Sequence, residues 1–193
     1  MNRTHIINSI IKKISAKSYL EIGVCKGKNI FNVECEYKVG VDPSPQSPAN
    51  FYLTSDEFFE INEQTFDVIF VDGLHISKQV TKDIENSLEI LNNGGYIICH
   101  DVNPWCEEVQ RVPYMGGEWT GDCWKAFVKL RQREDLQMFV VDCDCGCGVI
   151  TKGKQKPLNI IEEELNYENL SLNRKEWLNL ITPEEFEELI NEC

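Results

Sequence analysis

The chain has 193 residues, enough for one full-sized hydrophobic core but too few for two domains without a clear linker. Its formal net charge of -13 argues against a nucleic-acid partner, because a polyanion meets net repulsion. No apolar run approaches the roughly 20 residues that span a bilayer, and no small-residue cleavage site follows the N-terminal segment. We therefore expect one cytoplasmic domain over residues 1–193, with no membrane partner; the oligomeric state stays open.

The first hundred residues are predicted to alternate between helix and strand. Isoleucines recur at three- and four-residue spacing between residues 4 and 17, which predicts an amphipathic helix covering one face of a sheet. Several of the following strands are apolar at both alternating sets of positions, which is typical of a parallel sheet buried on both faces. The expected strands are residues 18–24, 37–42, 51–53, 66–72 and 96–100.

Later elements are predicted from helical stripes and turn signals. A stripe over residues 76–91 predicts a helix that stops at "NNGG", residues 92–95. A second helix is expected near residues 124–130, and "MFVVDCDCGCGVIT" predicts two strands joined by a tight turn. The chain closes with "TPEEFEELI", where Thr182 and Glu185 form a capping box around a final helix. Residues 152–193 are thus expected to be a helical extension.

Nine cysteines are present, an odd number in a chain without a secretory signal, so reduced thiols are expected. Three of them alternate in "DCDCGCGV". A metal site there is conceivable, but zinc usually takes four ligands at C-x2-C spacing and no histidine lies nearby in sequence, so a turn around Gly146 is favoured. Four others lie within or beside apolar segments and are expected to be core thiols: Cys25, Cys35, Cys99 and Cys106.

In "YLEIGVCKGKNIF" the apolar run of the predicted strand at residues 18–24 is broken after Glu21 by Gly23 and Gly27, in a loop that is expected to reopen as a helix. The G-x-G-x-x-G pattern of dinucleotide enzymes fails here, because Cys25 and Lys28 occupy its second and third glycine positions. A nicotinamide oxidoreductase is therefore a weak hypothesis. The alternative to any ligand role for the glycines is an ordinary tight turn between strand and helix.

Asp42 ends the next predicted strand in "KVGVDPS", nineteen positions after Gly23. A carboxylate at that place can accept hydrogen bonds from both hydroxyls of a ribose. The pattern therefore predicts an adenosine-containing ligand, although Asp42 could instead cap a turn.

Five segments together resemble class I S-adenosylmethionine-dependent methyltransferases: "EIGVCKG", "VGVDPS", "FDVIFVDGLH", "LNNGGYIICHDVNP" and "GDCWKAFVKLR". The resemblance runs over residues 18–151 and is nearest to a small bacterial and viral branch that loosely resembles catechol and caffeoyl-CoA O-methyltransferases. It implies an α/β fold, a Rossmann-like three-layer sandwich whose seven-stranded, mostly parallel sheet ends in an antiparallel hairpin. Residues 18–151 would be the cofactor-binding core.

The resemblance also implies roles for the residues that would bind S-adenosylmethionine. The two glycines would let the backbone approach its methionine part, Glu21 would orient it, and Asp42 would hold the ribose. The implied cofactor-binding set is Glu21, Gly23, Gly27, Asp42, Ser55, Asp56 and Asp72, with Ser55 and Asp56 near the adenine.

Asp72 and Asp101 follow neighbouring predicted strands, so both carboxylates should lie at the carboxyl edge of the sheet, where open α/β sheets bind ligands. Together they could hold Mg²⁺, which would lower the pKa of an acceptor hydroxyl. Metal-dependent relatives carry an amide after the second Asp and a lysine three residues after the first. Here Val102 and His75 stand at those positions, so the third metal ligand is in doubt.

His75 and Asp101 are the predicted catalytic residues, since a neutral imidazole can accept a proton near pH 7. The alternative for His75 is capping or packing at the following helix, and for Asp101 capping of its loop. For His100 the favoured interpretation is burial with one satisfied hydrogen bond. Neither His100 nor Asn103 is implied as a metal ligand by the resemblance.

Residues 102–122 are too long for a simple connection and contain Trp105, Tyr114 and Trp119. We interpret them as an acceptor-binding lid, with a packed aromatic cluster as the alternative. The predicted function is methylation of a small molecule, with O-methylation of a sugar or polyol-like hydroxyl as the finer hypothesis. The competing hypothesis is a non-catalytic relative that binds the cofactor and acts as a partner or regulator.

Overall fold

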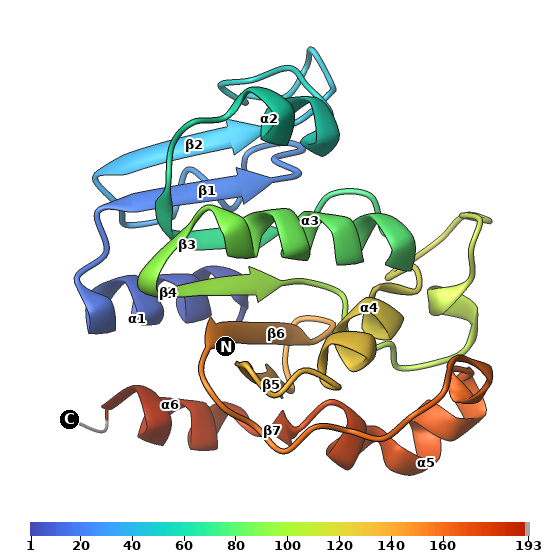
Figure 1. The fold of residues 1–193 in the computed structure, drawn as a ribbon. Helices are drawn as coiled ribbons and strands as arrows, with labels where there is room; N and C mark the ends of the chain where they lie inside the picture. The colour runs from blue at the N-terminus through green and yellow to red at the C-terminus, as the bar shows by residue number, and fades with distance from the viewer. Residues whose placement is uncertain (192–193) are drawn as a thin grey trace.

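A seven-stranded sheet forms the centre of the fold in the computed structural model, which describes residues 1–191 (Figure 1). The strands lie in the order β2-β1-β3-β4-β6-β5-β7. Their bounds are β1 Ser18–Ile22, β2 Tyr37–Val41, β3 Phe66–Val71, β4 Leu91–Cys99, β5 Leu136–Val141, β6 Cys147–Lys152 and β7 Leu180–Ile181.

Most strand pairs are parallel. β1 pairs in parallel with β2 and β3, β3 with β4, and β5 with β7. β6 runs antiparallel to both β4 and β5. The predicted α/β sheet, mostly parallel and with an antiparallel hairpin, is therefore confirmed.

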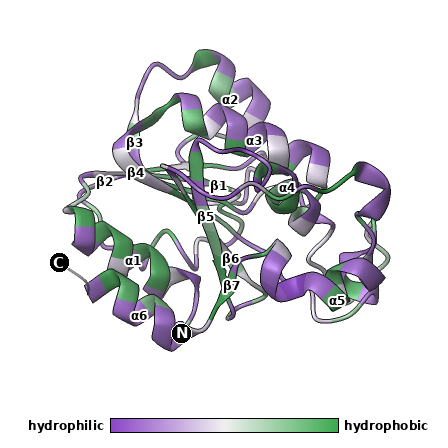
Figure 2. Cartoon of the chain, turned by 60° about the horizontal axis from the view of Figure 1, so that its bottom comes forward, coloured by the Kyte–Doolittle hydropathy of each residue, from purple (hydrophilic) through white to green (hydrophobic). Residues whose placement is uncertain are grey.

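Residues 1–191 contain six α-helices, and those packed on the two faces of the sheet make a three-layer sandwich. Side chains alternate across each strand: Leu20 and Ile69 join the core beneath α3 and α4, while Tyr19 and Val68 join the core beneath α1 and α6. Figure 2 shows α1 and α6 together on one side of the sheet, and α2, α3 and α4 on the other. The helices are α1 Arg3–Ile14, α2 Ser55–Ile61, α3 Ser77–Glu89, α4 Cys123–Leu130, α5 Tyr167–Trp177 and α6 Pro183–Asn191.

α1 forms as the isoleucine spacing predicts. Its N-cap is Asn2, whose side-chain oxygen accepts the His5 N–H at 2.9 Å, and it ends at Ser15 with a left-handed φ of 53°. The face that carries Ile6 and Ile10 is buried against the sheet. Packing of this face fixes where the start of the chain lies.

The predicted strand at residues 51–53 is wrong. Phe51 makes only an isolated bridge to Val41, and its ring instead packs edge-on against Phe58 of α2 with centroids 5.3 Å apart. The seventh strand of the sheet is β7 in the C-terminal extension, which the sequence interpretation treated as helical. A two-residue strand carries too little pattern to be recognised.

The "NNGG" segment does not cap α3, which ends at Glu89 before reaching it. Residues 91–95 form the irregular start of β4, where the pairing with β3 shifts register between Phe66 and Val68. The final capping box is present: Thr182 N–H donates to Glu185 at 2.7 Å, and Glu185 N–H donates to the Thr182 hydroxyl oxygen at 3.2 Å.

Candidate active site

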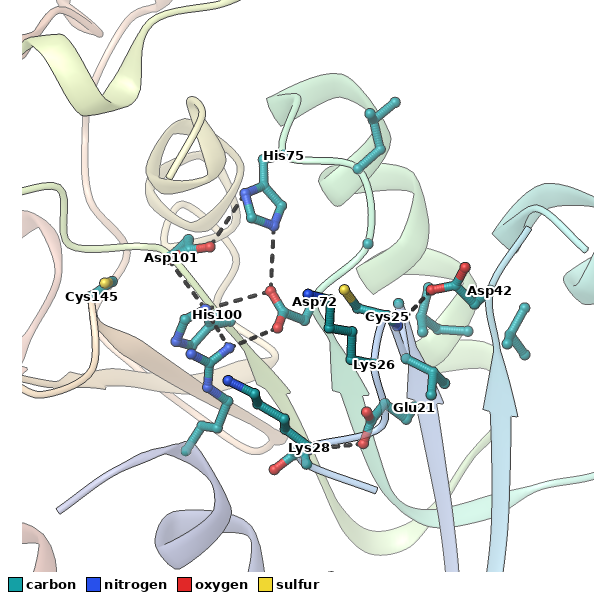
Figure 3. Close-up of a pocket in the computed structure, with 18 of the residues that line it drawn as sticks. Glu21, Cys25, Lys26, Lys28, Asp42, Asp72, His75, His100, Asp101 and Cys145 are labelled. Carbon is teal, nitrogen blue, oxygen red and sulfur yellow. Dashed lines mark hydrogen bonds and ion pairs between the residues drawn. The ribbon is translucent and has the colours of Figure 1, made fainter. Parts of the chain in front are cut away.

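A cavity of about 1580 Å³ opens where β1, β2, β3 and β4 end at their carboxyl edge (Figure 3). Ligand pockets for single small molecules usually measure roughly 300–1,000 Å³, so this cavity has room for a cofactor and a second molecule. The predicted site residues that line it are Glu21, Gly23, Asp42, Ser55, Asp56, Asp72, His75 and Asp101.

Gly23 and Gly27, in the loop after β1, have different structural roles. Gly23 has φ +91°, and a Cβ there would lie 2.0 Å from the Asp72 carbonyl oxygen, so only glycine lets this loop pass the end of β3. Gly27 does not belong to the cavity wall. A Cβ on it would lie 2.6 Å from Phe31 and from Pro48, which shows that Gly27 serves packing behind the loop.

Glu21 is almost fully buried at the cavity floor. Its Oε2 accepts a hydrogen bond from the Tyr19 hydroxyl at 2.6 Å and from Asn29 Nδ2 at 2.8 Å. Burial raises the pKa of this carboxyl to about 7, although both hydrogen bonds oppose the shift. Glu21 can therefore change its charge near neutral pH.

Asp42 is fixed by the backbone on both sides. Its Oδ2 accepts the Cys25 N–H at 2.7 Å, and its Oδ1 accepts the Ser44 N–H at 2.8 Å. These are the contacts of a turn cap, which was the alternative interpretation, yet the carboxylate also lines the cavity. Each oxygen keeps a second lone pair, so capping and ribose binding are compatible.

Ser55 and Asp56 start α2 at the cavity rim. Asp56 is already engaged: it accepts hydrogen bonds from Lys82 at 2.6 Å and from Gln79 at 2.9 Å. A ligand that reached this rim would meet an ion pair instead of a free carboxylate.

Asp72, His75 and Asp101 converge, as predicted from their places at neighbouring strand ends (Figure 3). His75 Nε2 lies 3.4 Å from Asp72 Oδ1, and His75 Nδ1 lies 3.3 Å from Asp101 Oδ2. Among residues 1–191, Nδ1 has no partner in hydrogen-bond geometry. Asp101 has a left-handed φ of 61°, a strained conformation of the kind that clusters at functional sites.

Three further residues complete this cluster and were not predicted as site residues: Arg3, His100 and Asp144. Arg3 donates to Asp72 Oδ2 at 2.9 Å and makes a forked contact with Asp144 at 2.9 and 3.1 Å. His100 Nδ1 lies 3.2 Å from Asp101 Oδ1, and its Nε2 is buried without a hydrogen-bond partner in the described part of the chain. No local sequence signal announces Arg3 or Asp144, because only the fold brings them here.

The electrostatics of the cluster follow from these contacts. Burial alone would lower the pKa of His75 and of His100, but the neighbouring carboxylates outweigh burial and raise both, that of His100 well above its usual range. Burial alone would raise the pKa of Asp72, yet His100, His75 and Arg3 hold it well below its usual range. In this cluster His75 and His100 are therefore stronger bases than free imidazoles, and Asp72 is a stronger acid than a free carboxyl.

These residues do not fit the Mg²⁺ site of metal-dependent relatives. Val102, at the position of the expected amide, is fully buried in the core, and the Asn103 side chain contacts Asp142 and Arg174 instead. The compact donor set at this edge consists of Asp72, His75 and Asp101, within 4.8 Å of one another. Mg²⁺ prefers oxygen ligands throughout, and here an imidazole stands between the two carboxylates.

The predicted lid lines the cavity through Trp105, Glu118, Trp119 and Thr120. Trp119 stacks on His75 with ring centroids 5.1 Å apart and an interplanar angle of 25°, and Tyr114 packs against Trp119. For Trp119 the packed-cluster alternative is therefore correct. Trp105 is 49% exposed and is the aromatic face left open beside the cavity.

The eight described cysteines are all free. Cys99 is a buried core thiol, as expected. Cys25 is exposed in the glycine loop, so the expectation of a core thiol is wrong for this residue. The predicted turn at Gly146 is present between β5 and β6. The fold also brings His100 and Asp144 near Cys147, which the sequence could not indicate, but Arg3 occupies both oxygens of Asp144.

Residues 20–102 match the sequence model of a family described as "Methyltransferase domain". This segment carries the glycine loop, Asp42 and all three converging residues. This segment is similar to a methyltransferase domain. The expected resemblance to class I S-adenosylmethionine-dependent methyltransferases is confirmed, and with it the expectation of a methyltransferase. Comparison with curated proteins gave no match.

Solved structures that share the fold of this chain are numerous. A Staphylococcus aureus protein provisionally designated a caffeoyl-CoA O-methyltransferase matches with a TM-score of 0.60 and 15% identity, over 78% of this chain and 82% of that one. An O-methyltransferase from Bacillus cereus in complex with SAH matches with a TM-score of 0.55 and 14% identity, over 79% and 82%. The SAH-bound Podospora anserina methyltransferase PaMTH1 gives 0.55 and 17%, over 79% and 78%. At these identities the neighbours show a shared fold.

Within residues 1–191, no helix is both long enough and apolar enough to cross a bilayer.

Proposed function

We propose that this protein transfers a methyl group from S-adenosylmethionine to a hydroxyl of a small molecule, with a sugar or polyol-like compound as the acceptor class. The observation that carries the proposal is the His75 ring, held between Asp72 and Asp101 on the wall of a cavity that also contains the glycine loop. A base beside a cofactor-sized cavity is what methyl transfer to a hydroxyl requires.

Neighbours bound to SAH or SAM support the choice of cofactor. The proposed cofactor-binding residues of this chain are Glu21 and Gly23 at the first strand end, Asp42 at the second, and Asp72 at the third; all line the cavity. Ser55 and Asp56 at the rim would lie near the adenine. Glu21 in its charged form suits the cofactor's ammonium group.

S-adenosylmethionine supplies an electrophilic methyl group on a sulfonium centre. His75 accepts the proton of the acceptor hydroxyl as the new O–CH₃ bond forms and the S–CH₃ bond breaks, and no covalent intermediate with the protein is needed. Asp72 and Asp101 stabilise the imidazolium that results and hold the ring in place. Arg3 lies against Asp72 and His100 against Asp101, and Arg3 and His100 help to hold the pKa of Asp72 below its usual range.

The alternative mechanism places Mg²⁺ between Asp72 and Asp101. The donor set argues against it, so we propose that activity does not depend on a divalent ion. Dialysis against a chelator checks this: unchanged activity supports His75 alone, whereas a loss restored by Mg²⁺ supports the metal mechanism.

The proposed acceptor class rests on an exposed aromatic side chain beside the cavity and on the net charge of the chain. Trp105 offers an open aromatic face of the kind that sugars and planar molecules contact. One structural neighbour from Clostridium thermocellum carries a provisional rRNA-methylase designation, at 13% identity. The net charge of -13 favours a small molecule over RNA.

The first experiment is calorimetry with S-adenosylmethionine, S-adenosylhomocysteine and NAD. Heat of binding with both sulfur nucleosides and none with NAD is expected, and tight NAD binding alone contradicts the proposal. The second is a screen for S-adenosylhomocysteine release with a panel of polyhydroxylated acceptors. Binding without turnover on any acceptor would instead favour the non-catalytic partner or regulator.

Substitution of His75 tests the proposed base. His75→Asn should lower kcat by roughly 10²–10⁴-fold with little change in cofactor affinity. Because the carboxylates raise the pKa of His75, wild-type activity should rise with pH through a value above the usual 6.5 or so, and the variant should lose this limb. A variant with wild-type kcat and an unchanged pH profile would exclude His75 as the base.

A further inference from the structure

The position of His75 needs an explanation, because the residue lies in a loop. α3 begins two residues later, at Ser77, and its N-cap Ile76 offers no side-chain hydrogen bond. Helix geometry therefore does not hold the imidazole. The contacts that surround it come instead from residues 119–122, at the end of the predicted lid.

Trp119 contacts the imidazole itself. The two rings stack with centroids 5.1 Å apart, and the indole is anchored by a hydrogen bond from Nε1 to the Arg111 carbonyl oxygen at 2.6 Å. The His75 ring is thus bounded by the indole on one face and directed at Asp72 and Asp101 through its nitrogens.

Gly121 contacts the backbone of His75. It has φ +58°, and a Cβ on it would lie 1.8 Å from the His75 carbonyl oxygen and 2.6 Å from the His75 Cβ. No side chain can be accommodated at this distance. The close approach is possible only for glycine, and it fixes the peptide that follows His75.

Asp122 holds the start of α3. Its Oδ1 accepts the Ser77 N–H at 2.6 Å, and its Oδ2 accepts the Ser77 hydroxyl at 3.0 Å. It thereby supplies, from 45 residues away in sequence, the cap that Ile76 cannot provide. A negative charge there also suits the positive end of the helix.

We propose that Trp119, Gly121 and Asp122 form a clamp that sets the position and ring orientation of His75, and that they are positioning residues for methyl transfer. This deepens the proposed function and rests on His75 as the base. The Asp122 cap alone would stabilise the start of α3 but would not determine the orientation of the His75 ring. The stacked indole and the glycine contact add the specific fit, since both act on His75 itself.

Histidine NMR tests the clamp without any knowledge of the acceptor. The chain contains only three histidines, so their ring-proton resonances can be assigned with His75→Asn. Protons stacked on an indole are shifted upfield by its ring current. Trp119→Ala should move the His75 resonances downfield, and Trp119→Phe should retain part of the shift. Trp105→Ala removes a tryptophan of the same cavity that does not stack on His75 and should leave them unchanged.

Asp122 is tested in the same spectra. Asp122→Ala should move or broaden the His75 resonances, while Asp122→Asn, which keeps an oxygen for the Ser77 N–H, should be nearer wild type. If Asp122→Ala does not fold, Ser77→Ala removes only the hydroxyl bond and should give a smaller change. Unchanged His75 resonances in folded Trp119→Ala and Asp122 variants would overturn the clamp.

Kinetics separate the clamp from the proposed function. Trp119→Ala should reduce kcat in the wild-type background but cause no further loss in His75→Asn, because residues that act through one group are not additive. If the resonances move but His75→Asn remains active, the clamp stands and the base assignment fails. If His75→Asn is inactive and the resonances do not move, the base stands and the clamp fails.

Discussion

Glu21 combines deep burial with a ligand-facing position. The Tyr19 hydroxyl and the Asn29 amide both donate to one oxygen, which stabilises the charged form, but the loss of water around the group is larger and raises its pKa to about 7. Near neutral pH the protonated and charged forms of Glu21 are therefore close in free energy. A cationic group that arrived beside it would favour the carboxylate, so cofactor binding and proton release are expected to be coupled.

This shift predicts a pH dependence of stability. The folded pKa of about 7 exceeds the unfolded value, so the contribution of Glu21 is fully present below the unfolded pKa of about 4.3 and is lost as pH rises through 7. Between pH 5 and pH 8, wild type should lose about 2–3 kcal/mol more unfolding free energy than Glu21→Gln, measured with urea. Other titrating groups are common to both proteins and cancel. Parallel pH curves would show that Glu21 is not shifted.

The turn-cap role of Asp42 and its proposed role in ribose binding can be separated by substitution. Because it caps the backbone at Cys25 and Ser44, Asp42→Ala would disturb the loop as well as any ribose contact. Asp42→Asn keeps an oxygen for one backbone donor while removing the charge. It should weaken cofactor binding by about 1–3 kcal/mol in calorimetry, with a smaller loss of thermal stability than Asp42→Ala. Equal affinity for wild type and Asp42→Asn would leave Asp42 as a turn cap only.

Site residues were predictable where they directly follow an apolar predicted strand. Asp72 and Asp101 follow apolar strands, and parallel strands end at a common edge, so their convergence follows from the pattern. Arg3 and Asp144 lie in a helix start and a hairpin turn, where no local pattern marks a site, and their distance in sequence hides the forked contact between them. Gly27 was assigned to the cofactor, yet its neighbours Phe31 and Pro48 are known only once the loop is folded.

At the scale of elements, buried strands and long helices were predictable because their apolar periodicity spans several residues. β1, β2 and β3 lie where the apolar runs placed them. The failures are short or irregular: residues 51–53 make a single bridge, and β7 has two residues. Glycines such as Gly94 and Gly95 occur both at helix ends and at irregular starts of strands. Composition alone therefore could not tell whether this segment ends α3 or begins β4.

The loop after β1, which reaches β2 through turns and not through the expected helix, predicts a sharp contrast between two glycines. Gly23→Ala would bring a Cβ to 2.0 Å from the Asp72 carbonyl oxygen, so it should abolish cofactor binding in calorimetry and lower the melting temperature severely. Gly94 is the control, since it also has a positive φ but a Cβ there meets nothing within 4 Å. Gly94→Ala should cost only about 1–2 kcal/mol of backbone strain and keep binding. Similar behaviour of both variants would exclude the steric argument.

At the scale of the whole molecule, the site is assembled from the two ends of the fold. The N-terminal helix brings Arg3, the parallel half of the sheet brings Asp72 and Asp101, and the hairpin of the antiparallel half brings Asp144 (Figure 1). α6 packs on the same face of the sheet as α1, where Phe186 is fully buried in one core cluster with the α1 isoleucines. Arg3 is therefore an ionic link between segments that the chain separates by more than a hundred residues.

This link predicts that Arg3→Gln destabilises the whole fold. Asp72 and Asp144 would lose a half-buried cation, which should lower the free energy of unfolding by about 1–3 kcal/mol at neutral pH. Arg133→Gln removes an equal charge from a more exposed pair with Asp135, and should cost about 0–1 kcal/mol.

The stabilisation by Arg3 should depend on pH. Contacts with His100 and Arg3 hold the pKa of Asp144 below its usual range, so the stabilisation is present above the unfolded pKa of about 3.9 and is lost as pH falls through the folded value. The difference between wild type and Arg3→Gln should therefore shrink in acid. At pH 7, Arg3→Gln should have much less effect when it is introduced into Asp144→Asn than into wild type. Urea unfolding of the five proteins, the double variant included, measures these differences. If Arg3→Gln matched Arg133→Gln at every pH, the link between the ends of the fold would carry no stability, and Arg3 would matter only for the charge of the site.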